Sequence, residues 1–474
     1  MPDGGSKPLV VESGFMNKLK SFFITCIFSK ILNFLDKAWK LAVSEPKMVF
    51  HCLKVGLALS FVSFFYYMRP LYDGVGGNAM WAVMTVVVVF EYTAGATLCK
   101  CVNRVMGTFL AGGLGIGVHW VATQSGPKFE PIILGISVFI LAFSATFSRF
   151  IPSIKARFDY GAAIFILTFC LVTVSGYRVE KLFELAHERL ATIAIGTSIC
   201  ILISLLLFPV WAGTELHLLI CNNLEKLADS LHGCVEDYFE IEKNDNDEKE
   251  DEEMINKKLN GYKCVLNSKA TEETMANFAR WEPAHGNFNF RHPWKQYIKV
   301  GALMRSCAYC IESLNGCVDQ EIQAPEVLKE QFREVCMKLS SECSNVLKEL
   351  AFTMKTMTKS LKVDIMVADM NFAVQDLHNT LKTIPILPSA TITKSLGIPL
   401  VQVLPIATTI SLLTELTSRI EELADALNQL AIMADFSDVE DEDKGMFEEE
   451  GHHNIIISNG NSQDNEIIKK TIQN

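Results

Sequence analysis

The sequence contains none of the short motifs that mark the common catalytic sites. It has no GxSxG nucleophile turn, no P-loop lysine motif, no HExxH helix and no glycine-rich loop that would open a nucleotide fold. Its 10 histidines are dispersed along the chain. An enzyme is therefore not expected.

The chain also lacks a net positive charge, since 54 acidic residues outnumber 43 lysines and arginines and the formal net charge is -11. A nucleic-acid partner is disfavoured, because phosphate backbones select basic protein faces. The acidic residues gather in two runs, NDNDEKEDEE at 244–253 and VEDEDKGMFEEE at 439–450. Such runs repel themselves and stay solvated, so we interpret them as a linker and a tail.

The 14 cysteines lack the regular spacing of a secreted disulfide framework, so reduced thiols are expected. Cys307 and Cys310 form a single CxxC, with Cys317 further along, but no second CxxC or HxxxH pair completes a zinc site. No cofactor is expected. The polar, glycine-rich first residues do not predict a cleaved signal peptide.

Long hydrophobic runs are present, and nearly all of them lie between Phe50 and Ala212. Each run is close to the roughly 20 residues that cross a bilayer, and six in close succession would be hard to bury in a soluble core. The sequence therefore predicts six membrane spans: Phe50–Met68, Ala79–Leu98, Met106–Thr123, Pro131–Phe147, Gly161–Tyr177 and Ala191–Ala212.

Apolar residues recur at three and four positions in the second half, as in helices that bury one face. The four segments with this pattern are Glu215–Glu242, Lys295–Val318, Pro325–Met357 and Pro399–Ala434. They predict a helical bundle. Leu404–Met433 could also pair with a second copy of the chain, which hints at a dimer, or serve as a core helix.

These patterns together predict an all-α protein, with a six-span transmembrane domain followed by a cytosolic helical bundle. We divide the chain into residues 1–48 (cytosolic N-terminal region), 49–212 (membrane domain), 213–435 (cytosolic helical domain) and 436–474 (acidic disordered tail). Lysines alternate with apolar residues from Phe15 to Val43. This pattern predicts an amphipathic helix lying on an anionic lipid surface, with a seventh span as the competing interpretation.

Lysine and arginine counts favour a cytosolic N-terminus, because that orientation puts more positive charge inside. An even number of spans then returns the chain to the cytosol, so both termini are expected there. The inner side would carry the N-terminal lysines with Lys47, Lys100, Arg104, Arg149, Lys155 and Arg157.

Charged residues inside spans are costly and usually face a partner or an aqueous path. Lys54 and Glu91 are the two candidates. An interhelical ion pair, or a Lys54 side chain reaching back to the cytosolic surface, would explain them structurally. The functional interpretation places Lys54 on a conduction path.

Arginine residues precede the third and sixth spans, where helix N-termini would add positive potential. Arg104 follows Lys100 on one expected tight joint, and Arg189 follows Arg178 on the other. A guanidinium matches a carboxylate in geometry, so these joints are candidates for an anion pore. Ordinary interfacial flanking is the alternative. Arg149, Lys155 and Arg157 are expected to form a cytosolic vestibule or a ring around lipid headgroups.

Three long segments resemble a known family. Residues 81–117 read WAVMTVVVVFEYTAGATLCKCVNRVMGTFLAGGLGIG, residues 158–178 read FDYGAAIFILTFCLVTVSGYR, and residues 281–316 read WEPAHGNFNFRHPWKQYIKVGALMRSCAYCIESLNG. The chain is similar over roughly residues 40 to 435 to the plant aluminium-activated malate transporter family. It departs from the family pattern at Cys101, where glycine is usual, and at Cys310, where arginine is common.

The resemblance implies a homodimeric anion channel with six spans per subunit, a basic pore and a helical cytosolic domain, passing malate and often inorganic anions. Lys54, Arg104 and Arg189 match basic residues that the family places near its pore. The short N-terminal region resembles the plasma-membrane members more than the vacuolar ones. The name alone does not transfer aluminium sensitivity.

An aluminium ion would favour carboxylate oxygens on the outer side. Asp73, Glu180 and Glu184 would be exposed there in the expected topology and form a candidate aluminium site.

Two rival functions remain open. A proton-coupled organic-acid carrier would use Glu91 as a buried titratable group, whereas a membrane-anchored scaffold would make the charges in the spans dispensable.

Overall fold

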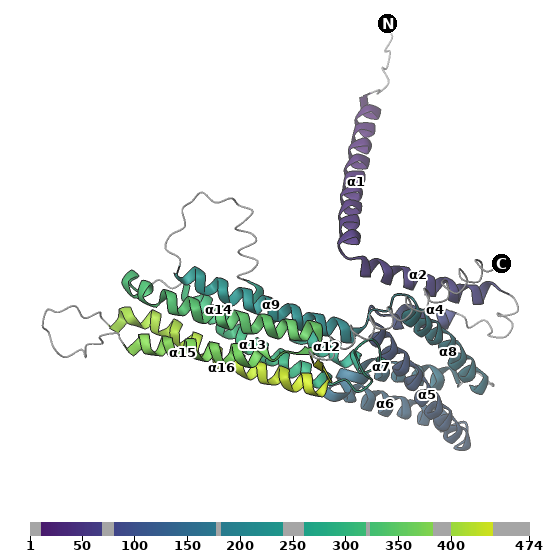
Figure 1. Cartoon of the computed structure of the whole chain (residues 1–474). Helices are drawn as coiled ribbons and strands as arrows, with labels where there is room; N and C mark the ends of the chain where they lie inside the picture. The colour runs from purple at the N-terminus through teal and green to yellow at the C-terminus, as the bar shows by residue number, and fades with distance from the viewer. Residues whose placement is uncertain are drawn as a thin grey trace, which may run out of the picture. The chain divides into compact units, whose positions relative to one another are not determined.

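A computed structural model of the chain is almost entirely helical (Figure 1). It describes residues 11–68, 80–176, 182–239, 260–318, 323–382 and 400–438. The chain divides into two compact units, Met1–Val210 and Trp211–Asn474. Within the described residues the strands are limited to β1 (Thr358–Lys359) and β2 (Ser437–Asp438), which pair in parallel. The all-α fold class is confirmed.

Among the described residues of the first unit, five helices are long and apolar enough to cross a membrane: Pro46–Phe64, Ala94–Gln124, Glu130–Ser148, Pro152–Val174 and Arg189–Leu206. They belong to α2 (Pro46–Tyr67), α5 (Ala94–Gln124), α6 (Glu130–Ser148), α7 (Pro152–Gly176) and α8 (Leu182–Leu206). A further helix, α1 (Val11–Ser44), covers the segment expected to be amphipathic. Its described side chains leave Phe34 and Trp39 70% and 71% exposed.

The second expected span is not a continuous helix. Its first part forms α4 (Met80–Val89), which has only 10 residues, and the helix is then broken at residues 90–93. The break satisfies its own polar groups: Thr97 donates a hydrogen bond to the Glu91 carbonyl, and the Ala94 amide donates to the Val210 carbonyl at 2.8 Å. Backbone that leaves the helix at membrane depth requires such internal partners.

Small residues allow α5 to pack closely against α7. A Cβ atom on Gly107 would lie 2.7 Å from the Gly161 carbonyl oxygen, and one on Gly115 would lie 2.7 Å from Val172. Gly112 and Gly113 lie on a different face, with nothing within 4 Å of their Cβ positions. The glycine-rich helix therefore packs on one side and stays open on another.

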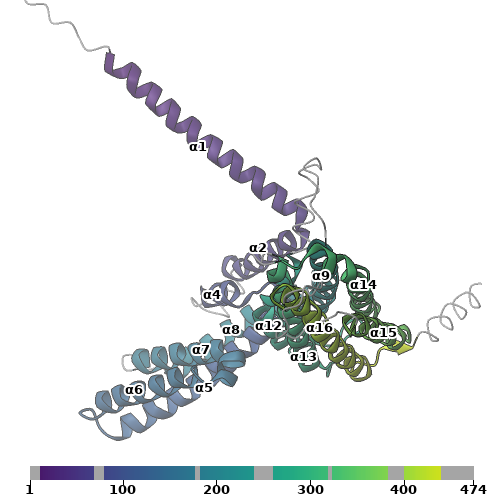
Figure 2. The same cartoon turned by 90° about the vertical axis from the view of Figure 1, so that its left-hand side faces the viewer.

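The second unit is a bundle of long helices, seen partly end-on in Figure 2. It contains α9 (Ala212–Phe239), α11 (Gly261–Leu266), α12 (Lys269–Ala279), α13 (Trp294–Val318), α14 (Glu326–Thr356), α15 (Lys362–Lys382) and α16 (Leu400–Met433). Its core includes the fully buried side chains of Leu216, Leu224, Tyr297, Phe332 and Leu416. The four expected amphipathic helices correspond to α9, α13, α14 and α16, whereas α12 and α15 were not anticipated.

The Trp-Glu-Pro segment fixes the start of α9. The Glu282 carboxylate accepts hydrogen bonds from the amides of Ala212 and Gly213 at 2.6 and 3.0 Å. The Trp294 ring packs so closely on Gly213 that a Cβ there would meet it at 2.5 Å. A carboxylate at this end satisfies orphan amides and complements the helix dipole.

The structure continues to Asp438, three residues into the segment expected to be a disordered tail. Phe436 is 3% exposed, and Ser437 and Asp438 pair with β1. The short parallel pair holds the end of α16 against the end of α14. The acidic run at 439–450 lies outside the described residues.

Candidate anion site between the membrane helices

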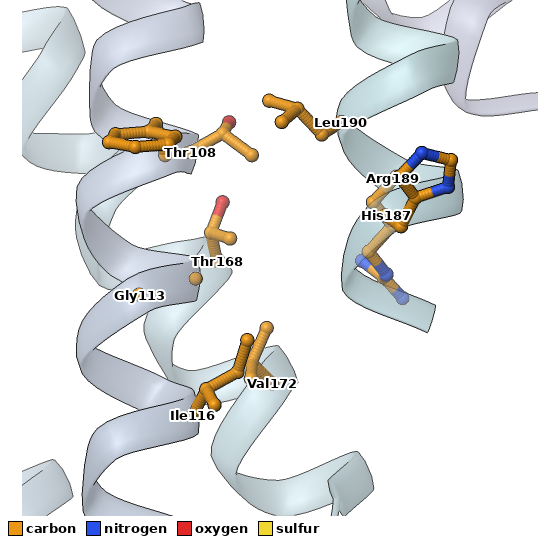
Figure 3. A pocket seen from close by; sticks show the side chains of 10 residues that line it. Thr108, Gly113, Ile116, Thr168, Val172, His187, Arg189 and Leu190 are labelled. Atoms are coloured by element: carbon orange, nitrogen blue, oxygen red, sulfur yellow. The ribbon is translucent and has the colours of Figure 1, made fainter. Parts of the chain in front are cut away.

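A cavity of about 240 Å³ lies between α5, α7 and α8 (Figure 3). Figure 3 shows Thr108, Gly113 and Ile116 on one side with Thr168 and Val172, and His187, Arg189 and Leu190 facing them. The open face of α5 at Gly112 and Gly113 contributes to its wall. The absence of side chains at these glycines leaves the space that the cavity occupies.

A second, narrower cavity of about 20 Å³ shares Thr108, Thr168 and Arg189 with the first. Trp81 and Arg104 complete its polar and aromatic lining. The two cavities are therefore neighbours along the same helices. The structure brings Arg104 and Arg189 together, although they are far apart in sequence.

The guanidinium groups of these two arginines are incompletely paired. Arg104 is 5% exposed, and its Nη1 donates a hydrogen bond to the Tyr160 hydroxyl at 3.1 Å. Arg189 lies over the Trp81 ring, 4.3 Å from its centroid. The Nε atoms of both arginines are buried with no hydrogen-bond partner among the described residues. Buried donors of this kind normally have an acceptor.

The cavities collect positive charge without compensating carboxylates. No Asp or Glu is among the described residues that line either of them. Two threonine hydroxyls, from Thr108 and Thr168, add hydrogen-bond donors at the same place. An unpaired buried cation is costly, and a bound or passing anion would relieve that cost.

The sequence-based reason for choosing Arg104 was partly wrong. We expected Lys100 and Arg104 on a tight joint before a helix start, but α5 begins at Ala94 and both lie inside it, Arg104 about three turns in. Arg189 likewise lies about two turns inside α8. The helix-terminus argument therefore applies to neither arginine, since the dipole effect is confined to the first turn.

Lys100 lies near the break between α4 and α5. Its ammonium group pairs with the Glu91 carboxylate and lies 5.5 Å from the centroid of the Tyr160 ring. Glu91 is thus engaged with a lysine, as the structural alternative anticipated, although its partner is Lys100 instead of Lys54. Lys100 lines neither of the two cavities.

Lys54 is almost fully buried and makes a structural contact. Its ammonium group donates a hydrogen bond to the Phe208 carbonyl at 2.8 Å, and its exposed fraction is 4%. Phe208 has a φ of 41°, a left-handed conformation that is unusual outside glycine. Lys54 therefore stabilises the chain just beyond α8, and it lines neither cavity.

The residues expected at a vestibule lie around the joint between α6 and α7. Arg149 forms a two-point ion pair with Asp159, with distances of 2.7 and 3.1 Å. Lys155 and Arg157 are exposed, and the Arg157 carbonyl accepts a hydrogen bond from Asn103 at 3.0 Å. Two exposed cations thus remain near this joint.

Several expected site residues lie outside the described residues: Arg178 of the pore set, and Asp73 and Glu180 of the aluminium set, together with the side chain of Glu184.

The sequence analysis missed other residues at the site. Thr108 follows Arg104 by four positions and shares its helix face, so spacing could have found it. Tyr160 and Trp81 carry no comparable signal, because only the packing of separate helices brings them to the arginines.

Apolar helices long enough to span a bilayer, enclosing a basic cavity without carboxylates in its described lining, define a membrane transport protein suited to anions. Comparison with known proteins agrees. Residues 39–397 match the family described as "Aluminium activated malate transporter". The chain belongs to that family. Its members are named transporters, so the chain is a transport protein and not an enzyme.

Similar proteins cover most of the chain. It is 56% identical to Aluminum-activated malate transporter 10 of Arabidopsis thaliana, over 92% of this chain and 93% of that protein. It is 46% identical to Aluminum-activated malate transporter 2 of the same plant, over 86% of this chain and 79% of that protein. Aluminum-activated malate transporter 1 of Triticum aestivum is 43% identical to it, over 86% of this chain and 87% of that protein.

Proposed function

We propose that the chain is an anion channel that passes malate and other organic or inorganic anions through the basic cavities between α5, α7 and α8. The observation that carries the proposal is the meeting of Arg104 and Arg189, whose Nε donors are buried and unpaired, at cavities that no described carboxylate lines. A dicarboxylate offers acceptors to both. The names of the relatives support malate as a substrate.

The two arginines give the pathway its selectivity for anions. Arginine remains charged at every physiological pH, so the cavity keeps its positive potential. Thr108 and Thr168 replace part of the hydration shell as an anion passes. Lys54, Lys100 and Arg178 complete the proposed pore set outside the lining of the two cavities. Arg149, Lys155 and Arg157 form the proposed cytosolic vestibule, which raises the local anion concentration.

Whole-cell current tests the proposal in a heterologous cell loaded with malate, with external chloride varied. We expect Arg104→Gln and Arg189→Gln each to reduce the malate current at least about tenfold, the effect of roughly 1.4 kcal/mol on a rate. Arg291→Gln, an exposed change in the second unit, removes the same charge and is the matched control. Full current in both pore variants at equal surface expression would exclude this pathway.

The proton-coupled carrier is the alternative, and Glu91 is the residue that favours it. Its carboxylate pairs with Lys100 instead of standing alone. A channel predicts a reversal potential that follows the malate and chloride gradients at every external pH. A carrier predicts a reversal potential that moves with the proton gradient and a loss of that movement in Glu91→Gln.

We further propose that the protein acts as a homodimer in the plasma membrane, with both termini in the cytosol; the vacuolar membrane is the alternative location.

Aluminium activation is proposed through Asp73, Glu180 and Glu184. Replacement of all three by amides should abolish an aluminium-dependent increase of current while leaving the basal current. An unchanged increase would dispose of this aluminium site.

A further inference from the structure

The second unit contains a cavity of about 560 Å³ that lies between α14, α15, α16 and the short strand pair. This volume is in the range that small-molecule sites occupy. Its floor is apolar, with Leu350, Leu427 and Ala431 exposing between 2% and 3% of their surface. Its rim is exposed at Leu361, so a small molecule could enter from solvent.

The charges around this cavity are predominantly negative. Asp364, Glu421, Asp425 and Asp438 line it, whereas Lys359 is the single cation among the described lining residues. Lys359 is already paired with Asp438 at 3.2 Å. Three carboxylates therefore face the cavity with no ion pair to a described residue.

Two of those carboxylates are placed where they repel each other. Glu421 and Asp425 are four residues apart on α16, so they are neighbours on one helix face. Ala424, Asn428 and Ala431 share that face and also line the cavity. Like charges at this spacing destabilise a helix by a few tenths of a kcal/mol, unless a cation lies between them.

A buried hydroxyl inside the cavity is without a partner. Thr353 is 9% exposed and lines the cavity from α14. Its Oγ1 is buried and makes no hydrogen bond to any described residue. Buried polar atoms are rarely left in this state, and a bound molecule with an N–H donor would satisfy the hydroxyl oxygen.

We propose that this cavity binds a flexible organic amine carrying two or more ammonium groups on a methylene chain. The ammonium groups pair with Glu421, Asp425 and Asp364, the chain covers the apolar floor, and an N–H group donates to the Thr353 hydroxyl. The exposed carboxylates do not gather into a metal site, since no group of three metal-ligating side chains forms among the described residues.

Charge excludes the nearest segment of the chain itself as the occupant. The residues that follow Asp438 begin with VEDEDKGMFEEE, an acidic run that an acidic cavity repels. The proposal concerns a site separate from the anion pathway and does not depend on the proposed transport function. Its test therefore measures binding and not current.

Isothermal titration of the full chain in lipid nanodiscs with spermidine and with 1,4-diaminobutane tests the proposal, with ammonium chloride as the small-cation control. We expect saturable binding of both amines and none of ammonium at the same concentration. Glu421→Gln/Asp425→Asn should weaken binding about tenfold. Glu334→Gln/Glu422→Gln, which removes the same charge from exposed positions outside the cavity, should change it less than about twofold.

Thr353→Val keeps the shape of the side chain and changes no charge, so it separates a specific site from general attraction to an acidic surface. We expect about threefold weaker binding in this variant at an unchanged thermal midpoint. Equal weakening in both charge pairs, or no effect of Thr353→Val, would overturn the proposal. Saturable binding of an oligolysine peptide without binding of the diamine would also overturn it, in favour of a basic protein segment.

Discussion

Tyr160 contacts Arg104, the more deeply buried of the two cavity arginines. Its hydroxyl accepts a hydrogen bond from Arg104 at 3.1 Å, and its ring lies near the Lys100 ammonium group. We expect Tyr160→Phe to lower the malate current about 2- to 10-fold, because the guanidinium loses a neutral partner that orients it. Whole-cell current at equal surface expression measures this effect.

Tyr309→Phe is the control for that change, since Tyr309 is 55% exposed in the second unit. A merely structural role of Tyr160 would lower expression and leave the anion preference as it was. A role in orienting Arg104 should also change the ratio of malate to chloride current. The same current ratio in Tyr160→Phe and the parent chain would refute this role.

We expect a buried histidine pair to make the stability of the second unit depend on pH. His217 and His292 lie 3.0 and 3.1 Å from the Tyr297 hydroxyl. Burial lowers the pKa of His217, and burial with the nearby histidines lowers the pKa of His292 to about 4. Both histidines are therefore neutral in the folded protein at pH 7.

The sign of the effect follows from these lowered pKa values. The unfolded chain binds protons more readily between the unperturbed pKa near 6.5 and the lowered one, so stability falls as the pH drops across that window. For His292 the loss is about 3 kcal/mol once the pH is near 4, at about 1.4 kcal/mol per pKa unit. Stability above pH 7 should not vary from this cause.

Thermal unfolding of the full chain in detergent at pH 7.5 and pH 5.0 measures the effect. The midpoint assigned to the second unit should fall on acidification in the parent chain and fall less in His292→Gln. His378→Gln, at an exposed position, should keep the parent's pH dependence. An equal drop in His292→Gln and the parent would show that other groups cause it.

At the scale of elements, α9 depends on a side chain from a distant segment. Glu282 is 3% exposed and caps the first two amides of α9. We expect Glu282→Gln to destabilise the second unit by about 1 to 2 kcal/mol, since the charge that complements the amides and the dipole is lost. The thermal midpoint should fall by roughly 2 to 8 °C.

Glu326→Gln is the matched control, because Glu326 is an exposed acidic residue in the first turn of α14. Its contribution through the dipole is only a few tenths of a kcal/mol. If both variants unfolded at the same temperature as the parent, the cap would not be a determinant of stability. Differential scanning fluorimetry in detergent distinguishes the outcomes.

Periodicity predicted the long helices better than it predicted their interruptions. The apolar pattern of α13, α14 and α16 locates them within a few residues, because each buries one stripe against the same core. The break after Val89 was missed, since VVVVF reads as uninterrupted hydrophobicity and the hydrogen bonds that stop the helix come from Thr97 and Val210. Arg104 and Arg189 were identified from their expected positions at tight basic joints before the third and sixth spans. They meet because α5 packs against α8, and no pattern in the sequence predicts which residues of the two helices come together.

For the whole molecule, the broken helix decides the topology. A 10-residue helix is about 15 Å long, half of the roughly 30 Å hydrocarbon core, whereas α5 with 31 residues is about 46 Å long. If α4 and the break cross together, the membrane is crossed six times and both termini share a side. If α4 turns back, there are five crossings and the termini lie on opposite sides.

We expect six crossings, because α5 is long enough to begin beyond the membrane core. Lys100 lies in the second turn of α5 and pairs with Glu91 in the break before it, and both charged groups belong near an aqueous surface. Epitope tags inserted after Gly126 and after Ile151 test this, with a tag at the C-terminus. With an N-terminal tag inside, six crossings expose only the Gly126 tag on intact cells. Five crossings would instead expose the Ile151 and C-terminal tags and hide the Gly126 tag, which would also place the second unit outside the cell.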